Sequence, residues 1–133
     1  MTYTCNHIGL FSFQPEELTA FYVDKLGFEQ GESRFLSKDL ISLIFTVPAN
    51  GRMTKLFFGE ITLEVFSLEG GGLKSRTVDT SGYNHWGLTV EDKEKFCAEA
   101  EERGAEVIKV AVKDRFIYFI KDPEGNLIEV FEK

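Results

Sequence analysis

The sequence has little of several residue types, and each shortage excludes a class of protein. Its only two cysteines, Cys5 and Cys97, lie far apart without a CxxC spacing, so we expect reduced thiols rather than a disulfide framework. Lys and Arg number 15 against 22 Asp and Glu. The resulting net charge of -7 opposes nucleic-acid binding, which needs a cationic surface. No apolar run reaches about 18 residues, so we expect no membrane span.

The first residues also lack a secretory signal, because no basic stretch is followed by an apolar one. Together with the reduced cysteines, this predicts a cytoplasmic protein. What the chain has in plenty is apolar residues, with 43% hydrophobic, 14% aromatic and 13 Phe. That content supplies a packed core and excludes a disordered chain. At this length we expect one domain spanning residues 1–133.

The only two histidines occupy the same place in two near-identical pentapeptides. His7 lies in Asn-His-Ile-Gly-Leu (6–10), and His85 lies in Asn-His-Trp-Gly-Leu (84–88). A second pair of segments, residues 61–66 and 126–131, carries one glutamate each, Glu64 and Glu129, inside an apolar run. The order along the chain is His, Glu, His, Glu. We interpret this pattern as a duplicated module whose halves each give two ligands to one metal ion.

The periodicity predicts the same element order, β-α-β-β-β, in both halves. In the first half we expect a strand over 4–13, a helix over 15–26, strands over 28–35 and 40–47, and a broken strand or hairpin over 55–67. In the second half we expect a strand over 83–90, a helix over 93–103, and strands over 106–112, 115–121 and 127–132. A glycine-rich linker over 68–82 separates module one, about 4–67, from module two, about 83–132. The fold class is therefore α+β, with two tandem modules.

The repeat is imperfect, because the spacing from His7 to Glu64 is longer than that from His85 to Glu129. We place the additional residues in the middle strands of module one and their loops, where insertions cost little.

The four repeated side chains are suited to holding a metal. Each histidine shares a strand face with the glycine two residues on, and each glutamate has aliphatic neighbours that point the other way. An ionised carboxylate among apolar neighbours is costly unless it is paired or bound to a metal. A lone strand histidine is more often structural, but matched pairs in a duplicated frame are hard to obtain by chance. Two imidazoles and two carboxylates fit Ni, Co, Mn or Fe, and also Zn.

The sequence resembles the vicinal oxygen chelate superfamily, which includes glyoxalase I, bleomycin-resistance proteins, methylmalonyl-CoA epimerase, extradiol dioxygenases and fosfomycin-resistance proteins. The resemblance covers about residues 4–132. It rests on the two pentapeptides, on Phe-Tyr (21–22) leading to Leu-Gly-Phe (26–28), and on Asp-Pro-Glu-Gly-Asn-Leu-Ile-Glu (122–129). It implies that each module forms a curved mixed sheet and that two modules pair around a shared metal site.

The resemblance also implies a chemistry. Glyoxalase I enzymes carry His, Glu, His, Glu, which matches His7, Glu64, His85 and Glu129. Epimerases usually have Gln at the place of Glu64, and dioxygenases use only two His and one Glu. The implied activity is a lyase or isomerase acting on a small molecule with two adjacent oxygens through an enediolate. We assign the base to Glu129, with Glu64 as ligand or partner, although the sequence does not separate these two roles.

One feature departs from the glyoxalase I pattern. Enzymes of that type that use glutathione carry an arginine in the first strand, whereas residues 10–13 here are Leu-Phe-Ser-Phe. Arg34, Arg52, Arg76 or Arg115 could substitute. An epimerase, a dioxygenase, a binding protein like the bleomycin-resistance proteins and a diverged protein without chemistry remain alternatives.

We expect a homodimer, in which the modules pair within one chain or are exchanged between two chains. We also expect Cys5 to be buried. A group of phenylalanines is expected to pack in the core rather than to line a pocket: Phe11, Phe13, Phe57, Phe58 and Phe116.

Overall fold

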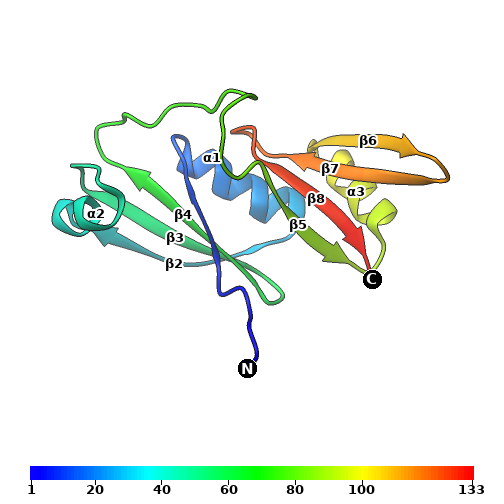
Figure 1. Cartoon of the computed structure of the whole chain (residues 1–133), viewed down its shortest axis with the longest axis horizontal. Coiled ribbons are helices and arrows are strands. Elements are labelled where there is room, and N and C mark those ends of the chain that lie inside the picture. The colour runs from blue at the N-terminus through cyan, green and yellow to red at the C-terminus, as the bar shows by residue number, and fades with distance from the viewer.

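The computed structural model describes residues 1–133 and consists of two four-stranded mixed sheets with helices between and beside them (Figure 1). The first module contains β1 (Ile8–Phe11), α1 (Pro15–Ala20), the π-helix η1 (Phe21–Lys25), β2 (Glu29–Leu36), α2 (Lys38–Phe45), β3 (Gly51–Phe58) and β4 (Ile61–Leu68). The second contains β5 (His85–Val90), α3 (Lys93–Glu102), β6 (Glu106–Val112), β7 (Arg115–Lys121) and β8 (Leu127–Glu132). The prediction of an α+β fold with two tandem modules is confirmed.

Both sheets have the same topology, with strand orders β1-β4-β3-β2 and β5-β8-β7-β6. In each sheet the first and last strands of the module lie side by side and run parallel, and the remaining pairs are antiparallel. This arrangement places the start of each module, which carries the histidine, beside the strand that carries the glutamate.

The two modules share one hydrophobic core of 16 buried residues. It contains Leu63 and Val65 of β4, Tyr22 of η1, and Ile128 and Val130 of β8. Because side chains alternate along a strand, the residues between these aliphatics point to the opposite face of their sheet. Each sheet therefore has a helix-facing side in the core and an outer side. None of the helices has the length and apolar content needed to span a lipid bilayer.

A buried polar cluster ties the modules together. The carboxylate of Asp122 accepts hydrogen bonds from the backbone N–H groups of Glu124 and Asn126, at 3.0 and 2.9 Å, and this closes the predicted turn between β7 and β8. The hydroxyl of Tyr22 donates to Asp122 Oδ2 at 2.9 Å. The hydroxyl of Ser12 donates to Glu124 Oε2. The turn of the second module is thereby fixed to the start of the first.

The predicted strand over 40–47 is wrong, because this segment lies within and after helix α2. The side chain of Ser37 caps the helix by accepting from the N–H of Leu40 at 3.2 Å. Ile41 is only 2% exposed, and the ring of Phe45 packs edge-on against Phe66 at 5.2 Å. The periodicity of a short apolar run does not distinguish a helix from a strand. The Ser37 cap and the apolar contacts at helical spacing determine that this segment is helical.

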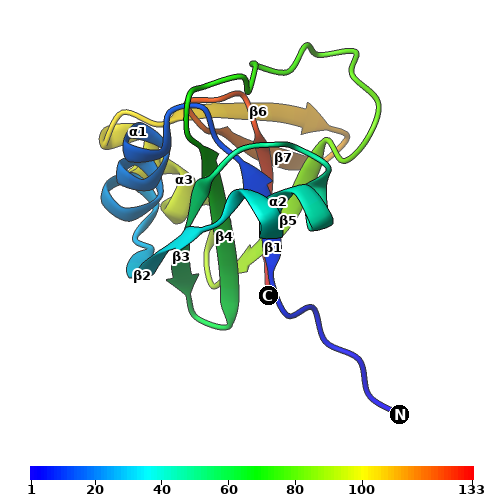
Figure 2. The same cartoon turned by 90° about the vertical axis from the view of Figure 1, so that its left-hand side faces the viewer.

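Helix α2 also accounts for the unequal spacing of the two modules. Residues 37–50 join β2 to β3, whereas only residues 113–114 join the equivalent strands β6 and β7. The prediction that the additional residues lie in the middle of module one is confirmed. Figure 2 shows α1 and α2 on either side of β3 and β4, so α2 covers part of the outer face of the first sheet.

Candidate metal centre

The first candidate pair consists of His7, directly before β1, and Glu64 on β4. The parallel register of these strands places Gly9 opposite Glu64. His7 Nε2 lies 3.5 Å from Glu64 Oε1, and the Glu64 side chain is 17% exposed. Because its neighbours Leu63 and Val65 face the core, Glu64 projects from the outer face of the first sheet.

The second pair repeats this geometry in the second sheet. Gly87 lies opposite Glu129 in the parallel register of β5 and β8. His85 Nε2 lies 3.3 Å from Glu129 Oε2, and the Glu129 side chain is 22% exposed. The duplication in the sequence is therefore also a duplication of the side-chain arrangement.

Each histidine is oriented by the asparagine that precedes it, a role that the sequence interpretation missed. His7 Nδ1 lies 2.8 Å from Asn6 Oδ1, and His85 Nδ1 is hydrogen-bonded to Asn84 Oδ1. An amide oxygen only accepts, so Nδ1 donates to the asparagine, and Nε2 is the ring nitrogen that faces the glutamate. Metal-binding histidines typically donate their second ring N–H in this way. The signal was present in the sequence, since Asn precedes both histidines.

The surroundings of the two pairs differ. Lys55 of β3 lies directly across from Glu64, and its Nζ is 4.0 Å from Glu32 Oε1. Phe119 of β7 occupies the equivalent place across from Glu129, and its ring lies 5.4 Å from the His85 ring. The first pair thus has a cation as its neighbour across the sheet, and the second has an aromatic ring.

One chain does not bring the four predicted ligands together. The pairs lie on the outer faces of different sheets, and no three His, Cys, Asp or Glu side chains in the chain gather at a point that could hold a metal ion. Each pair offers one imidazole nitrogen and one carboxylate, which are donors that suit a divalent transition metal. The four-ligand metal site stays a prediction.

Residues 4–130 match the sequence model of the Glyoxalase/Bleomycin resistance protein/Dioxygenase superfamily. The chain belongs to this superfamily. A glyoxalase family protein from Enterococcus faecalis is similar over 97% of both chains, with 25% identity and a TM-score of 0.77.

Other members of the superfamily share the fold at lower identity. The trypanothione-dependent glyoxalase I of Leishmania major is 20% identical, with a TM-score of 0.70, and the match covers 98% of this chain and 87% of that one. The fosfomycin resistance protein FosX from Mesorhizobium loti is 12% identical, with a TM-score of 0.65, and the match covers 100% and 94%. Both glyoxalase I and fosfomycin resistance proteins are thus among the structural relatives, and the fold does not single out one activity.

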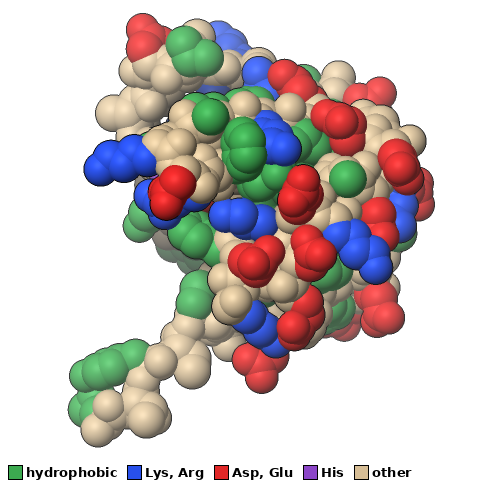
Figure 3. Space-filling view, turned by 90° about the vertical axis from the view of Figure 1, so that its right-hand side faces the viewer, with side chains coloured by type: hydrophobic (Ala, Val, Ile, Leu, Met, Phe, Trp, Pro, Cys, Tyr) green, Lys and Arg blue, Asp and Glu red, His purple; other side chains and the backbone are tan.

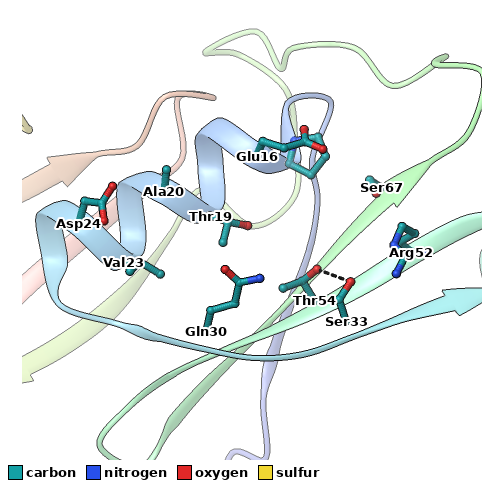
Figure 4. A pocket seen from close by; sticks show the side chains of 11 residues that line it. Glu16, Thr19, Ala20, Val23, Asp24, Gln30, Ser33, Arg52, Thr54 and Ser67 are labelled. Atoms are coloured by element: carbon teal, nitrogen blue, oxygen red, sulfur yellow. Dashed lines mark hydrogen bonds between the residues drawn. The ribbon is translucent and has the colours of Figure 1, made fainter.

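A cavity of about 530 Å³ opens beside the first pair. His7 and Glu64 line it, together with Arg34 of β2 and apolar residues of α2 and the first sheet. Figure 4 shows a different cavity, of about 460 Å³. Its residues Arg52 and Thr54 alternate along β3 with Met53, which lines the first cavity. The second cavity therefore lies on the opposite face of the sheet, the face toward α1. None of the four predicted ligands lines that second cavity.

The expected core role of the five phenylalanines is mostly wrong. Only Phe58 packs against the core, where its ring stacks on Phe28 at 4.9 Å. Phe11 lines the cavity beside His7. Four of the five are more than a third exposed: Phe11, Phe13, Phe57 and Phe116. The sequence does not distinguish an apolar residue of the outer sheet face from one in the core, because both faces are apolar here.

The two cysteines are free thiols, as predicted, but only one is buried. Cys5 is exposed, which corrects the expectation that it is buried, because the chain is not yet in a strand at this position. Cys97 lies in the core, and burial raises the pKa of its thiol to about 11.

Figure 3 shows acidic and basic side chains interspersed around exposed apolar ones at the end of the molecule that carries the second sheet.

Proposed function

We propose that the protein is a metal-dependent lyase or isomerase of the glyoxalase I type. Its substrate would be a small molecule with two adjacent oxygens, converted through an enediolate. The observation that supports this proposal is the pair of matching Asn-His-Glu arrangements, in each of which Nε2 faces a carboxylate. Structural histidines on unrelated strands have no reason to repeat this orientation.

The donor set fits one divalent ion. His7, Glu64, His85 and Glu129 would hold it, and Ni, Co, Zn, Mn or Fe is compatible with two imidazoles and two carboxylates. When bound, such an ion would polarise the two adjacent substrate oxygens and acidify the proton on the hydroxyl-bearing carbon next to the carbonyl.

The chain's own contribution is the movement of one proton. A glutamate takes the proton from the hydroxyl-bearing carbon, the C–H electron pair forms the C=C bond of the enediolate, and the carbonyl π pair moves to its oxygen. The same glutamate then returns the proton to the former carbonyl carbon, while the hydroxyl proton passes to the other oxygen as the new carbonyl forms. We assign this role to Glu129, because its neighbour across the sheet, Phe119, brings no competing charge. Glu64 has the basic residue Lys55 as its neighbour across the sheet and is assigned as a ligand.

We further propose that the complete site forms between two copies of the chain. The outer face of the second sheet has no covering helix and exposes apolar side chains, with Ile108, Val110 and Phe131 all more than a third exposed. An open apolar face of this kind is typical of an interface. If a second copy covers it with its first sheet, the partner's His7 and the partner's Glu64 meet His85 and Glu129.

The exchange of a substrate proton with solvent tests the activity. With a 2-hydroxy carbonyl substrate in D₂O and the metal-loaded protein, we expect deuterium to enter at the carbon beside the carbonyl. Glu129→Gln should slow this incorporation by about 100-fold or more, since a positioned base contributes that order of rate. Equal incorporation by the variant and the wild type would exclude Glu129 as the base. A metal-loaded wild type that neither incorporates deuterium nor converts the substrate would exclude the isomerase.

A further inference from the structure

We propose that the cavity beneath α2 binds the part of the substrate that does not react, and that this part is an apolar group bearing a carboxylate, which Arg34 binds. The inference rests on the proposed function, because it names the substrate class of the same site. It assigns to Arg34 the role of a specificity-determining residue.

The walls of the cavity are apolar and firmly held. The ring of Phe45 on α2 packs edge-on against Phe11 at 5.1 Å and against Phe66 at 5.2 Å. Ile41 of α2 lies so close to Gly51 that a Cβ there would stand 2.9 Å from Ile41 Cδ1. Helix α2 is therefore seated on the sheet by close contacts, and the cavity between them is built into the fold. Such a cavity suits an aromatic or branched aliphatic group.

Arg34 is the one cation in the lining of this cavity. It lies across from Met53, which also lines the cavity, so its side chain is on the same sheet face as Glu64. No carboxylate of the chain forms an ion pair with it. A guanidinium group offers five N–H donors in a planar fork that matches a carboxylate, and here these donors have no acidic partner in the protein.

The strand order gives the approximate separation of Arg34 and Glu64, and hence the length of ligand that could reach both. Arg34 is on β2 and Glu64 is on β4, with β3 between them. Two strand spacings correspond to about 10 Å across the sheet, and the register places Arg34 in line with Phe66, two residues along β4 from Glu64. The reacting oxygens beside His7 and Glu64 and the carboxylate beside Arg34 must therefore be separated by an apolar stretch about as long as a phenyl group with a short linker.

The remaining arginines considered from the sequence lie elsewhere. Arg52 lines the cavity of Figure 4 on the other face of the same sheet. Arg115 is on β7 near the acidic residues Glu91 and Asp92, and Arg76 is in the exposed linker. The first strand lacks an arginine, and Arg34 is the cation that the fold brings to the predicted ligands instead.

Binding of a matched acid and alcohol to the metal-free full-length protein tests the role of Arg34. The probes are 4-phenylbutyrate and 4-phenylbutanol, and the measurement is isothermal titration calorimetry. We expect the acid to bind about tenfold more tightly than the alcohol, because a charge-assisted bidentate contact is worth that order of affinity. Arg34→Gln should remove this preference, and the matched control Arg52→Gln should retain it. The proposal would be overturned if the wild type binds the two probes equally, or if Arg34→Gln and Arg52→Gln lose the preference for the acid to the same extent.

A second pair of variants tests the apolar wall. Ile44 of α2 lines the cavity, whereas Leu43 beside it does not, and these side chains are 60% and 83% exposed, so neither substitution should unfold the protein. Ile44→Ser should weaken the binding of both probes several-fold, and Leu43→Ser should leave it unchanged. If Leu43→Ser weakens binding as much as Ile44→Ser does, the probes do not occupy this cavity.

The proposed function and this inference can fail separately. Metal content and deuterium incorporation do not depend on the probes, and probe binding is measured without metal. A protein that binds metal but does not distinguish the acid from the alcohol would overturn the role of Arg34 alone. A protein that binds the acid through Arg34 but holds no metal would overturn the proposed function, and with it the identification of the acid as part of a substrate.

Discussion

At the scale of single residues, the asparagine before each histidine determines which ring nitrogen is free. Replacing Asn84 by Ala removes the acceptor of the Nδ1–H bond and lets the imidazole turn and change tautomer. We expect the affinity for metal to fall by about 10- to 100-fold, as measured by competition with a chelator. Asn84→Asp retains an acceptor and should keep most of the affinity. An unchanged affinity in Asn84→Ala would show that the asparagine does not orient the ring.

The sequence identified the residues that the structure brings together in pairs, but not everything around them. The repeat located His7, Glu64, His85 and Glu129, because the same two residue types recur in matching segments of both halves. The parallel pairing of the first and last strand of each module, which places each histidine beside its glutamate, is a finding of the structure. The sequence did not show which arginine lies near the predicted ligands, because the position of Arg34 depends on the register of β2 with β3 and on how α2 packs against the sheet. Both are tertiary features that leave no local signal.

At the scale of elements, the buried turn between β7 and β8 connects the modules through Tyr22 and Asp122. Burial raises the pKa of Asp122 above its ordinary value of 3.8, and the hydrogen bond from Tyr22 works in the opposite direction. The raised pKa means that the folded state holds a proton more tightly than the unfolded state. The stabilising contribution is complete below about 3.8 and is lost as the pH rises through the pKa of the folded state.

Tyr22→Phe should make this pH dependence steeper. Loss of the hydroxyl removes a donor to the ionised carboxylate, which should lower the free energy of unfolding by about 1–2 kcal/mol at neutral pH. The pKa of Asp122 should rise further, so the difference between variant and wild type should shrink as the pH falls through that pKa. Urea unfolding at a series of pH values measures both effects. Tyr83→Phe, at an exposed position, is the control, and a loss in Tyr22→Phe that does not vary with pH would contradict this account.

Periodicity predicted most elements of the fold and failed at α2. The strands of the second module alternate clearly, and Asp92 before the Lys93–Glu102 helix and Gly104 after it mark its ends. The segment 40–47 combines a β-favouring composition with apolar residues at positions that also suit a helix. Its conformation is set by the Ser37 cap and by contacts of Ile41 and Phe45 with the sheet, which only the tertiary structure supplies.

At the scale of the whole molecule, the two modules share a core but present their ligand pairs on separate outer faces. Because residues of both modules belong to this core, we propose that residues 1–133 fold as one domain. The modules are not equivalent: the outer face of the first carries α2 and a cavity, and that of the second is open. A site assembled from one face of each kind would hold its metal between two chains.

Mixed dimers distinguish exchange between chains from pairing within a chain. If the modules are exchanged, a dimer of one His7→Ala chain and one His85→Ala chain has one intact site, and its second site lacks both imidazoles. We therefore expect differently tagged, co-expressed and tandem-purified mixed dimers to bind about half the metal of wild-type dimers under limiting metal. Homodimers of either variant should bind much less. Mixed dimers that bind no more metal than these homodimers would contradict the exchanged arrangement.

The central claim is that two His-Glu pairs hold one divalent metal ion, and metal content by mass spectrometry tests it most directly. The wild type and a His7→Ala/His85→Ala variant should be compared after reconstitution with Ni, Co, Mn, Fe and Zn in turn. We expect about one ion per chain in the wild type, and none in the variant, with dimerisation unchanged. A wild type that binds none of these metals, or a variant that retains the wild-type content, would contradict the claim.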